Sequence, residues 1–364
     1  MKTTTNTFKS ISLCVAATVA LSACSRNDDP VIPVTPPSDG TTLTLDGGEG
    51  GSAAENSVYV DLSAEQQTSV KRDSWSLGFY NGSEFRVILN STNGSSAVAV
   101  DETDINAVSA DDINIDDLTI PLGQPGAFDN IDDVTGDLDN TVIAEISATD
   151  AENKVYVVNP KGGSHADVIS ADQLYKVRIL RAGEDYTLQY APLNATAFET
   201  LTIQKEADYN FQFISFETGP VTVEPAKAEW DFQWTWSVYF GGMPNGATYP
   251  YGFSDLIFIN HLAGVTAAEV IFEDENGDST GKPTYEDFAE ADLSGVSFSN
   301  NRNVIGSNWR ATTGDGAGRK DDRFYLIKDA AGNIYKLRFI SMGAGEDGGT
   351  RGYPELEYTL VKQG

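Results

Sequence analysis

Apolar and polar residues alternate along the stretch EWDFQWTWSVYF, from Glu229 to Phe240. Its even-numbered positions are large and apolar and include three tryptophans, whereas its odd-numbered positions are largely polar. This period is typical of a β-strand with one buried face, because a helix would scatter alternate residues around its axis. The sequence therefore predicts a core strand here, and Trp75, Leu77 and Phe79 in SWSLGFY predict a second one.

Short apolar runs separated by Gly, Asp and Asn turns fill most of the remaining chain. This pattern, together with plentiful aromatic residues, predicts an all-β protein with antiparallel sheets in a sandwich-like arrangement. Further strands are predicted at 58–62, 85–90, 154–158, 175–180, 186–190, 211–216, 220–223, 256–259, 268–272, 323–328, 335–340 and 356–361.

Three strand sequences of the first half recur in the same order in the second half. WSLGF at 75–79 matches WDFQW at 230–234, and KVYVV at 154–158 matches RFYLI at 323–327. The clearest pair is YKVRI, which begins at Tyr175, with YKLRF, which begins at Tyr335. We therefore predict two related β units in tandem, residues 57–193 and residues 194–364.

Residues 1–23 have the pattern of a secretory signal, with Lys2 and Lys9 before an apolar centre and small residues at the end. The sequence Leu21-Ser22-Ala23-Cys24 resembles a bacterial lipobox, which implies cleavage before Cys24 and lipidation of its thiol. Acyl chains would then be the membrane anchor. The alternative is an ordinary signal whose cysteine is incidental.

The residues after Cys24 predict where the chain resides. SRNDD at 25–29 resembles the acidic signal that sends lipoproteins of Bacteroidota to the outer face of the outer membrane. Residues 24–56 are rich in Pro, Thr, Gly and Ser and predict a flexible tether. We expect a lipid-anchored protein of the outer membrane, exposed at the cell surface.

The chain is strongly acidic, with a formal net charge of −30. Such a surface repels nucleic acid and anionic lipid headgroups, so contact with the membrane is expected through the lipid anchor alone. Cys14 and Cys24 both lie in the leader region, which leaves the folded part without a disulfide or a thiolate site. Residues 101–140 hold twelve acidic side chains without Lys or Arg; they predict a solvated insertion, because no regular Asp spacing indicates calcium.

Two stretches of the second half resemble the HmuY family of haem-binding surface lipoproteins. Residues 211–236, FQFISFETGPVTVEPAKAEWDFQWTW, resemble the aromatic strand, turn and Trp-Asp core strand of that family. Residues 323–339 resemble its closing hairpin, with the turn Asp-Ala-Ala-Gly-Asn. The resemblance implies an all-β fold and capture of haem or of haemoproteins, with an outer-membrane haem receptor as a further partner.

The resemblance also implies two His or Met ligands to the haem iron, and this sequence departs from that pattern. The matching positions fall near Lys282 and near Thr312 and Thr313, none of which carries a good iron ligand. Imidazole, thioether and phenolate groups elsewhere are therefore the candidates. We expect Met243 and His261 first. The weaker candidates are His165, Met342, Tyr249 and Tyr251.

Each candidate also has a structural alternative. Met243 and Met342 are able to fill gaps in a core, His261 to bond backbone at a strand end, and His165 to lie on the surface. The second hypothesis for the whole protein is a ligand-binding or adhesion module that keeps the fold without the iron ligands. No arrangement of residues in the sequence indicates an enzyme.

Overall fold

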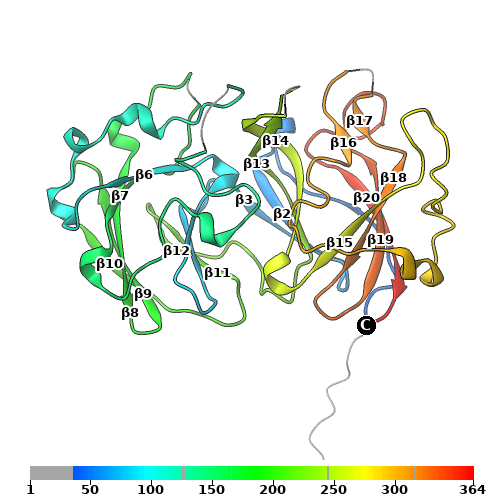
Figure 1. Ribbon diagram of the computed structural model, residues 1–364, viewed down its shortest axis with the longest axis horizontal. Helices are drawn as coiled ribbons and strands as arrows, with labels where there is room; N and C mark the ends of the chain where they lie inside the picture. Colours follow the sequence, from blue (N-terminus) through cyan, green and yellow to red (C-terminus); the bar gives the residue numbers. More distant parts are fainter. Residues whose placement is uncertain (1–35, 125–127, 165, 244–245, 315) are drawn as a thin grey trace, which may run out of the picture. The chain divides into compact units, whose positions relative to one another are not determined.

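The computed structural model describes residues 36–124, 128–164, 166–243, 246–314 and 316–364. Residues 37–364 form one compact unit. Its described residues form β-strands, joined by loops and short 3-10 helices (Figure 1). The predicted all-β class is confirmed, and neighbouring strands in the sheets are antiparallel. The described part of the chain contains no helix with the length and apolar character needed to span a bilayer.

One sandwich, which we call sandwich A, packs a four-stranded sheet of order β12-β11-β4-β5 against a five-stranded sheet of order β10-β9-β8-β7-β6. Leu77 and Phe79 from the first sheet share a buried core with Val177 and Leu188 from the second. Its strands are β4 Leu77–Tyr80, β5 Val87–Leu89, β6 Ser96–Val100, β7 Val155–Asn159, β8 Tyr175–Ala182, β9 Asp185–Pro192, β10 Glu199–Ile203, β11 Phe211–Ser215 and β12 Gly219–Val221.

The other sandwich, sandwich B, packs a sheet of order β14-β13-β2-β3 against one of order β1-β20-β19-β18-β15. Phe232 and Trp234 meet Leu337 and Tyr358 in its core. Its strands are β1 Thr42–Thr44, β2 Asn56–Asp61, β3 Gln66–Lys71, β13 Phe232–Gly242, β14 Thr248–Ile259, β15 Thr266–Ile271, β18 Arg323–Lys328, β19 Ile334–Ser341 and β20 Glu355–Lys362, with the small pair β16 Arg310–Ala311 and β17 Gly318–Arg319 beside them.

Short 3-10 helices occupy many of the connections. They are η1 Gly51–Ala53, η2 Ser91–Asn93, η3 Ile105–Ala107, η4 Ala110–Asp112, η5 Ile115–Leu118, η6 Leu138–Asn140, η7 Asp150–Glu152, η8 Ala171–Gln173, η9 His261–Ala263 and η10 Glu290–Gly295.

Each sandwich contains strands from both halves of the chain. β1, β2 and β3 belong to sandwich B, although the strands that follow them, β4 to β9, belong to sandwich A. Conversely, β10, β11 and β12 complete sandwich A before the chain returns to sandwich B. Figure 1 shows the blue β2 and β3 beside the yellow-green β13 and β14.

The sheet orders make the two halves equivalent, strand for strand. When the strand orders of sandwich A and sandwich B are aligned, each strand of one has a counterpart in the other. Strands β1 to β9 correspond, in this order, to β10, β11, β12, β13, β14, β15, β18, β19 and β20. The three sequence matches fall on equivalent strands or at their starts: β4 with β13, β7 with β18, and β8 with β19. The halves are therefore repeats that exchange their first three strands.

Two buried asparagines confirm this equivalence in detail. Asn90 and Asn260 each precede a 3-10 helix that ends at a glycine with positive φ, 71° at Gly94 and 90° at Gly264. Each amide donates to two backbone carbonyls, and the second of these belongs to Trp75 for Asn90 and to Trp230 for Asn260. A left-handed residue at this point favours glycine, which has no Cβ to clash.

Because of this strand exchange, the predicted boundary between residues 193 and 194 divides the two repeats but not the two sandwiches. It lies between β9 and β10, and so separates the two repeats along the chain. It does not separate the sheets, because β11 pairs with β4 and β2 pairs with β13. Two independent units in tandem are thus not confirmed.

The predicted tether does not extend to residue 56. β1 pairs with β20, and both Leu45 and Ala54 are buried in the core of sandwich B. The prediction missed this strand because it is three residues long and the surrounding glycines are typical of a linker. Cys24 and residues 1–23 lie outside the described residues.

Strand β13, which contains Trp234 and Trp236, is buried more extensively than the alternation of apolar and polar residues predicts. Trp234 lies in the core of sandwich B, but Thr235 and Ser237 on the odd-numbered positions are also buried. A β-bulge between Thr235 and Ser237 shifts the register, and Trp236 packs in a separate cluster with Ile120 and Ile131. Both faces are covered because the acidic region packs on this strand.

The acidic region 101–140 is folded rather than a simple solvated loop. Apolar residues such as Ile105, Leu118 and Ile131 are buried beneath it. Several of its Asp and Asn side chains accept hydrogen bonds from backbone amides at the starts of 3-10 helices, as Asp104 does from Asn106.

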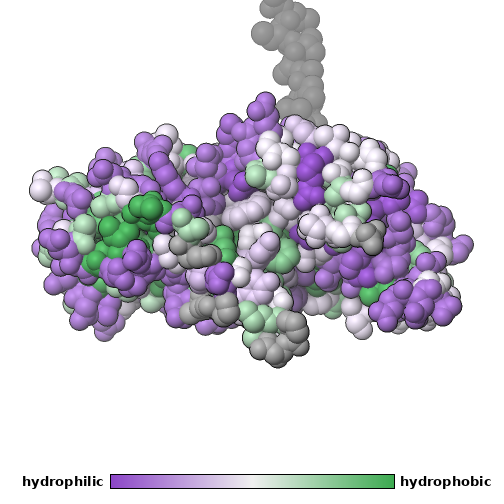
Figure 2. Space-filling view, turned by 90° about the horizontal axis from the view of Figure 1, so that it is seen from above, coloured by the Kyte–Doolittle hydropathy of each residue, from purple (hydrophilic) through white to green (hydrophobic). Residues whose placement is uncertain are grey.

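The surface shown in Figure 2 is largely hydrophilic, with smaller hydrophobic areas.

Candidate functional site

The structure separates the two residues that the sequence favoured as iron ligands. Met243 follows β13 at the turn of the β13–β14 hairpin, whereas His261 follows β14 at the opposite end. The strands are 11 and 12 residues long, which at about 3.3 Å per residue places these side chains roughly 35 Å apart. They cannot bind one iron together.

The other histidine and methionine candidates are no better placed. Met342 is fully buried in the core of sandwich B, among apolar side chains. His165 lies outside the described residues. Among the described residues, no group of three or more His, Cys, Asp or Glu side chains is arranged to hold a metal ion.

The two tyrosine candidates lie on the outer part of β14, where the hairpin extends. β13 and β14 are much longer than their equivalents β4 and β5, which span four and three residues. The rings of Tyr249, Tyr251 and Phe253 follow one another on one face, with centroids 6.2 Å and 5.2 Å apart. Tyr251 is 44% exposed, and among the described residues it is one of the few large apolar or aromatic side chains with such exposure.

Beside Tyr251 is a cavity of about 430 Å³, which we call the hairpin cavity. Thr312 and Thr313, the positions that the resemblance aligned with an iron ligand, form part of its wall. Its lining consists of Ser52, Tyr251, Gly252, Phe253, Ser254, Arg310, Thr312, Thr313, Gly343 and Arg351.

Two arginines and one carboxyl group set the charge of this cavity. Arg351 donates to Asp255 Oδ2 at 2.7 Å and to Ser254 Oγ at 2.8 Å, and Arg310 donates to the Ser254 carbonyl. Burial lowers the pKa of Arg310 to about 10, which leaves the guanidinium protonated at neutral pH. Because two guanidinium groups face one carboxyl group, the cavity wall carries net positive charge inside an acidic protein.

The backbone of this charged group is strained. Asp255 has φ 57°, an uncommon value for a residue with a Cβ, and it is buried at the bulge of β14. Its carbonyl accepts from the Trp309 indole at 2.8 Å. Strain of this kind costs on the order of 1–3 kcal/mol and gathers at binding and active sites.

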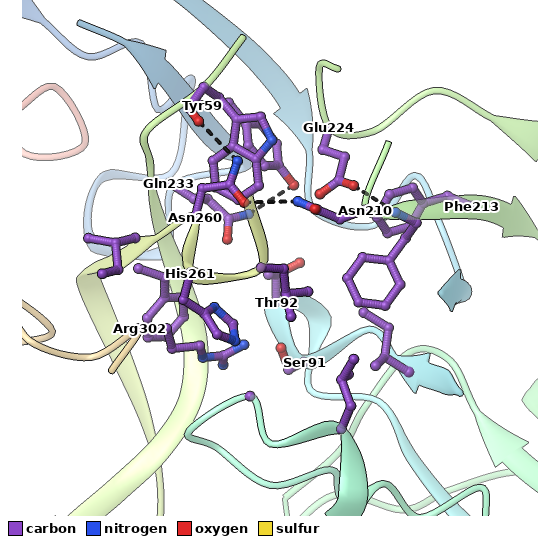
Figure 3. Close-up of a pocket in the computed structure, with 18 of the residues that line it drawn as sticks. Tyr59, Ser91, Thr92, Asn210, Phe213, Glu224, Gln233, Asn260, His261 and Arg302 are labelled. Carbon is purple, nitrogen blue, oxygen red and sulfur yellow. Dashed lines mark hydrogen bonds between the residues drawn. The ribbon is translucent and has the colours of Figure 1, made fainter. Parts of the chain in front are cut away.

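A second, smaller cavity of about 110 Å³ lies where the two sandwiches meet, and we call it the junction cavity (Figure 3). His261 lines it together with Arg302, Glu224 and Asn260. Burial, with Arg302 nearby, lowers the pKa of His261 to about 4, so its imidazole is neutral at pH 7. A neutral imidazole suits iron, but this cavity is well below the range of about 300–1,000 Å³ typical of ligand pockets for larger molecules.

Sequence reasoning found part of these sites. Tyr251 and His261 were candidates, and each lines one of the two cavities. Arg310, Arg351 and Glu224 were not, because single charged residues outside any motif give no signal until the fold brings them to a common wall.

Comparisons with known proteins place the chain in a family. A search of curated proteins found no match. A solved structure described as apo PinO from Porphyromonas gingivitis is similar at 16% identity, covering 46% of this chain and 87% of that one, with a TM-score of 0.15, which is too low to support a structural comparison. The family model described as HmuY protein matches residues 53–358, which include strands of both sandwiches. The chain belongs to the HmuY family.

Proposed function

We propose that this chain is a haem-binding protein without enzymatic activity, and that the hairpin cavity is its haem site. HmuY proteins form a ligand-binding, non-enzymatic family associated with haem. The observation that carries the proposal to this chain is the hairpin cavity itself, where an exposed tyrosine and two arginines line about 430 Å³.

The lining offers a partner for each chemical part of haem. Haem iron accepts phenolate as an axial ligand, which is the role we assign to Tyr251. Phe253 supplies an aromatic wall. Arg310 and Arg351 supply positive charge for the two propionate groups, since guanidinium binds carboxylate in bidentate geometry. The volume falls within the range of ligand pockets.

A haemin titration of residues 37–364, followed by absorbance in both oxidation states, tests the site. We expect a saturable Soret band for the wild type. Tyr251→Phe removes the ligand oxygen and keeps the ring, so it should weaken binding at least tenfold and change the ligation spectrum. Tyr249→Phe is the matched control, because this neighbouring ring is not part of the cavity wall, and it should leave the titration unchanged.

Other outcomes point elsewhere. A Soret band that survives Tyr251→Phe but is lost in Met243→Ala or His261→Ala would remove the site from the hairpin cavity. A featureless rise without saturation would contradict haem binding altogether.

A partner-binding or adhesion module is the second candidate function. It is favoured by the exposure of two aromatic residues on the same hairpin, Phe240 at 37% and Tyr251 at 44%. It is not favoured by the tryptophans, because Trp75, Trp230, Trp234 and Trp309 are all buried. Failure of the haemin titration would direct screening to glycans and partner proteins.

We further propose that the protein acts at the cell surface. Lipidation at Cys24 would anchor it in the outer membrane, from which it would take haem from the medium or from haemoproteins and pass it to an outer-membrane receptor. The support is the lipobox-like sequence before Cys24 and the acidic residues after it. The anchor is testable separately from haem binding.

A further inference from the structure

The junction cavity is formed by equivalent residues of the two repeats. Gly78 pairs with Phe213 on one side and Ile88 on the other, and Gln233 pairs with Tyr59 and Phe258 in the same way. Phe213 and Ile88 are therefore the counterparts of Tyr59 and Phe258, and Trp75 is the counterpart of Trp230. All six line the cavity.

Aromatic rings consequently surround much of this space. Tyr59 and Trp230 meet edge to face with centroids 5.1 Å apart, and Trp75 and Phe213 do so at 4.9 Å. Phe211 adds a further ring to the lining. Rings of this kind bind cations through their negative faces, and groups of them form the aromatic cages that hold alkylammonium ligands.

One buried carboxyl group, that of Glu224, makes the contributions of the two repeats to the cavity unequal. Glu224 lies between β12 and β13, a connection longer than its counterpart between β3 and β4. It is 5% exposed, lines the cavity and accepts hydrogen bonds from the Phe211 amide at 2.8 Å and from Asn210. No Lys, Arg or His nitrogen of the described residues lies within ion-pair distance of it. A buried carboxylate without a counter-ion is costly, so the site is suited to a cation.

The remaining charged groups around the cavity do not neutralise Glu224. Figure 3 shows Arg302 and His261 on the opposite side of the cavity from Glu224. The Arg302 guanidinium stacks on Phe258 at 4.3 Å and donates to the Val134 carbonyl, and Asp132 and Asp133 interact with its charge. The His261 imidazole is neutral at pH 7. The Tyr59 phenol remains protonated, because burial raises its pKa well above the usual value.

We propose that the junction cavity binds a small organic cation, an alkylammonium group, between the aromatic rings of both repeats and the carboxylate of Glu224. The cavity of about 110 Å³ is somewhat smaller than the 150 Å³ engineered cavity that holds benzene, which limits the occupant to a few heavy atoms. This site is distinct from the hairpin cavity and does not rest on the haem proposal.

Binding at this site is coupled to a proton. Burial raises the pKa of Glu224 to about 8, so the empty site holds a protonated carboxyl group at neutral pH. An organic cation binds the ionised form and therefore displaces one proton. Below pH 8, the ionised fraction falls about tenfold per pH unit, and the apparent affinity falls with it.

The test is calorimetric titration of residues 37–364 with tetramethylammonium chloride at constant ionic strength, from pH 6 to pH 9. We expect saturable binding, release of about one proton per ligand near pH 7, and a gain in affinity that is about tenfold from pH 6 to pH 7 and levels off above pH 8. Glu224→Gln should weaken binding at least tenfold and remove the pH dependence. Glu217→Gln changes an exposed carboxyl group of the β11–β12 turn and should have no effect.

tert-Butanol is the uncharged probe of similar size. Equal binding of tert-butanol would show an apolar cavity and overturn the proposal, as would the absence of saturable binding across this pH range. If Glu224→Gln fails to fold, the pH dependence of tetramethylammonium binding by the wild type still tests the proposal, because this measurement needs no variant. A haemin titration in the presence of tetramethylammonium should be unchanged, since the two cavities are separate.

Discussion

Two buried carboxyl groups make the stability of this protein depend on pH. Burial raises the pKa of both Glu224 and Asp231 to about 8, from usual values of 4.5 and 3.8. At pH values between the usual pKa and the raised pKa, each carboxyl group is protonated in the folded state and ionised in the unfolded state. Their contribution to stability is therefore complete below about pH 4 and is lost as pH rises through 8. Each group contributes up to about 1.4 kcal/mol per pH unit in this window.

His261 acts in the opposite direction. Its pKa is lowered to about 4 in the folded state, from 6.5. Folding therefore releases its proton between pH 4 and 6.5, and this contribution to stability rises with pH there. Above pH 6.5 this opposing contribution of His261 no longer changes with pH.

We predict that the free energy of unfolding falls between pH 6.5 and pH 8. Denaturant unfolding at closely spaced pH values measures the slope. Asp231→Asn keeps the size of the side chain and should reduce this slope by about half. Glu229→Gln, which changes an exposed carboxyl group two residues before Asp231, is the control. A free energy that rises with pH across this interval would contradict the buried, protonated state of both carboxyl groups.

At the scale of elements, the exchange of strands decides which parts of the chain can fold alone. Residues 74–223 contain β4 to β12, the complete set of sandwich A, in one continuous segment. Residues 37–193 form one repeat in sequence, but they contain β1 to β3 of sandwich B and lack β10 to β12.

We therefore expect the fragment 74–223 to fold as a monomer with a cooperative thermal transition. The fragment 37–193 should instead form a dimer, in which β1 to β3 of each copy complete the sheets of the other, as exchanged strands do in domain swapping. Size-exclusion chromatography with light scattering and circular dichroism measures both. A folded monomer of 37–193 would mean that the exchange is not intrinsic to the fold.

The sequence predicted strands better than it predicted their partners. The alternation around Trp230 and the match between Tyr175 and Tyr335 located equivalent strands, because the period of apolar residues along the chain indicates a strand with a buried face. Pairing across the predicted boundary depends on contacts between distant segments, which no local pattern encodes. For the same reason Tyr251 was found as a candidate, while Arg310 and Arg351 were recognised only once the fold placed them beside it.

At the scale of the whole molecule, the net charge and the proposed lipid anchor would have opposite effects on membrane contact. The chain has 54 acidic and 24 basic side chains, so its folded part is repelled by anionic headgroups. If the protein is attached to a membrane, stable attachment would require at least two acyl chains, because a single one gives only marginal, reversible binding. The proposed lipid on Cys24 would supply this attachment.

We predict that Cys24→Ala moves the protein from the membrane fraction to the soluble fraction and removes the mass of the acyl groups. Cys14→Ala is a matched control, because it changes the other cysteine of the leader and should leave the protein in the membrane fraction. Fractionation with mass spectrometry of the N-terminal peptide measures both changes, and protease treatment of intact cells reports surface exposure. Since neither substitution touches the residues of the two sandwiches, haemin binding by the soluble Cys24→Ala protein should equal that of residues 37–364. A Cys24→Ala protein that stays in the membrane fraction would show that something other than this lipid holds the chain there.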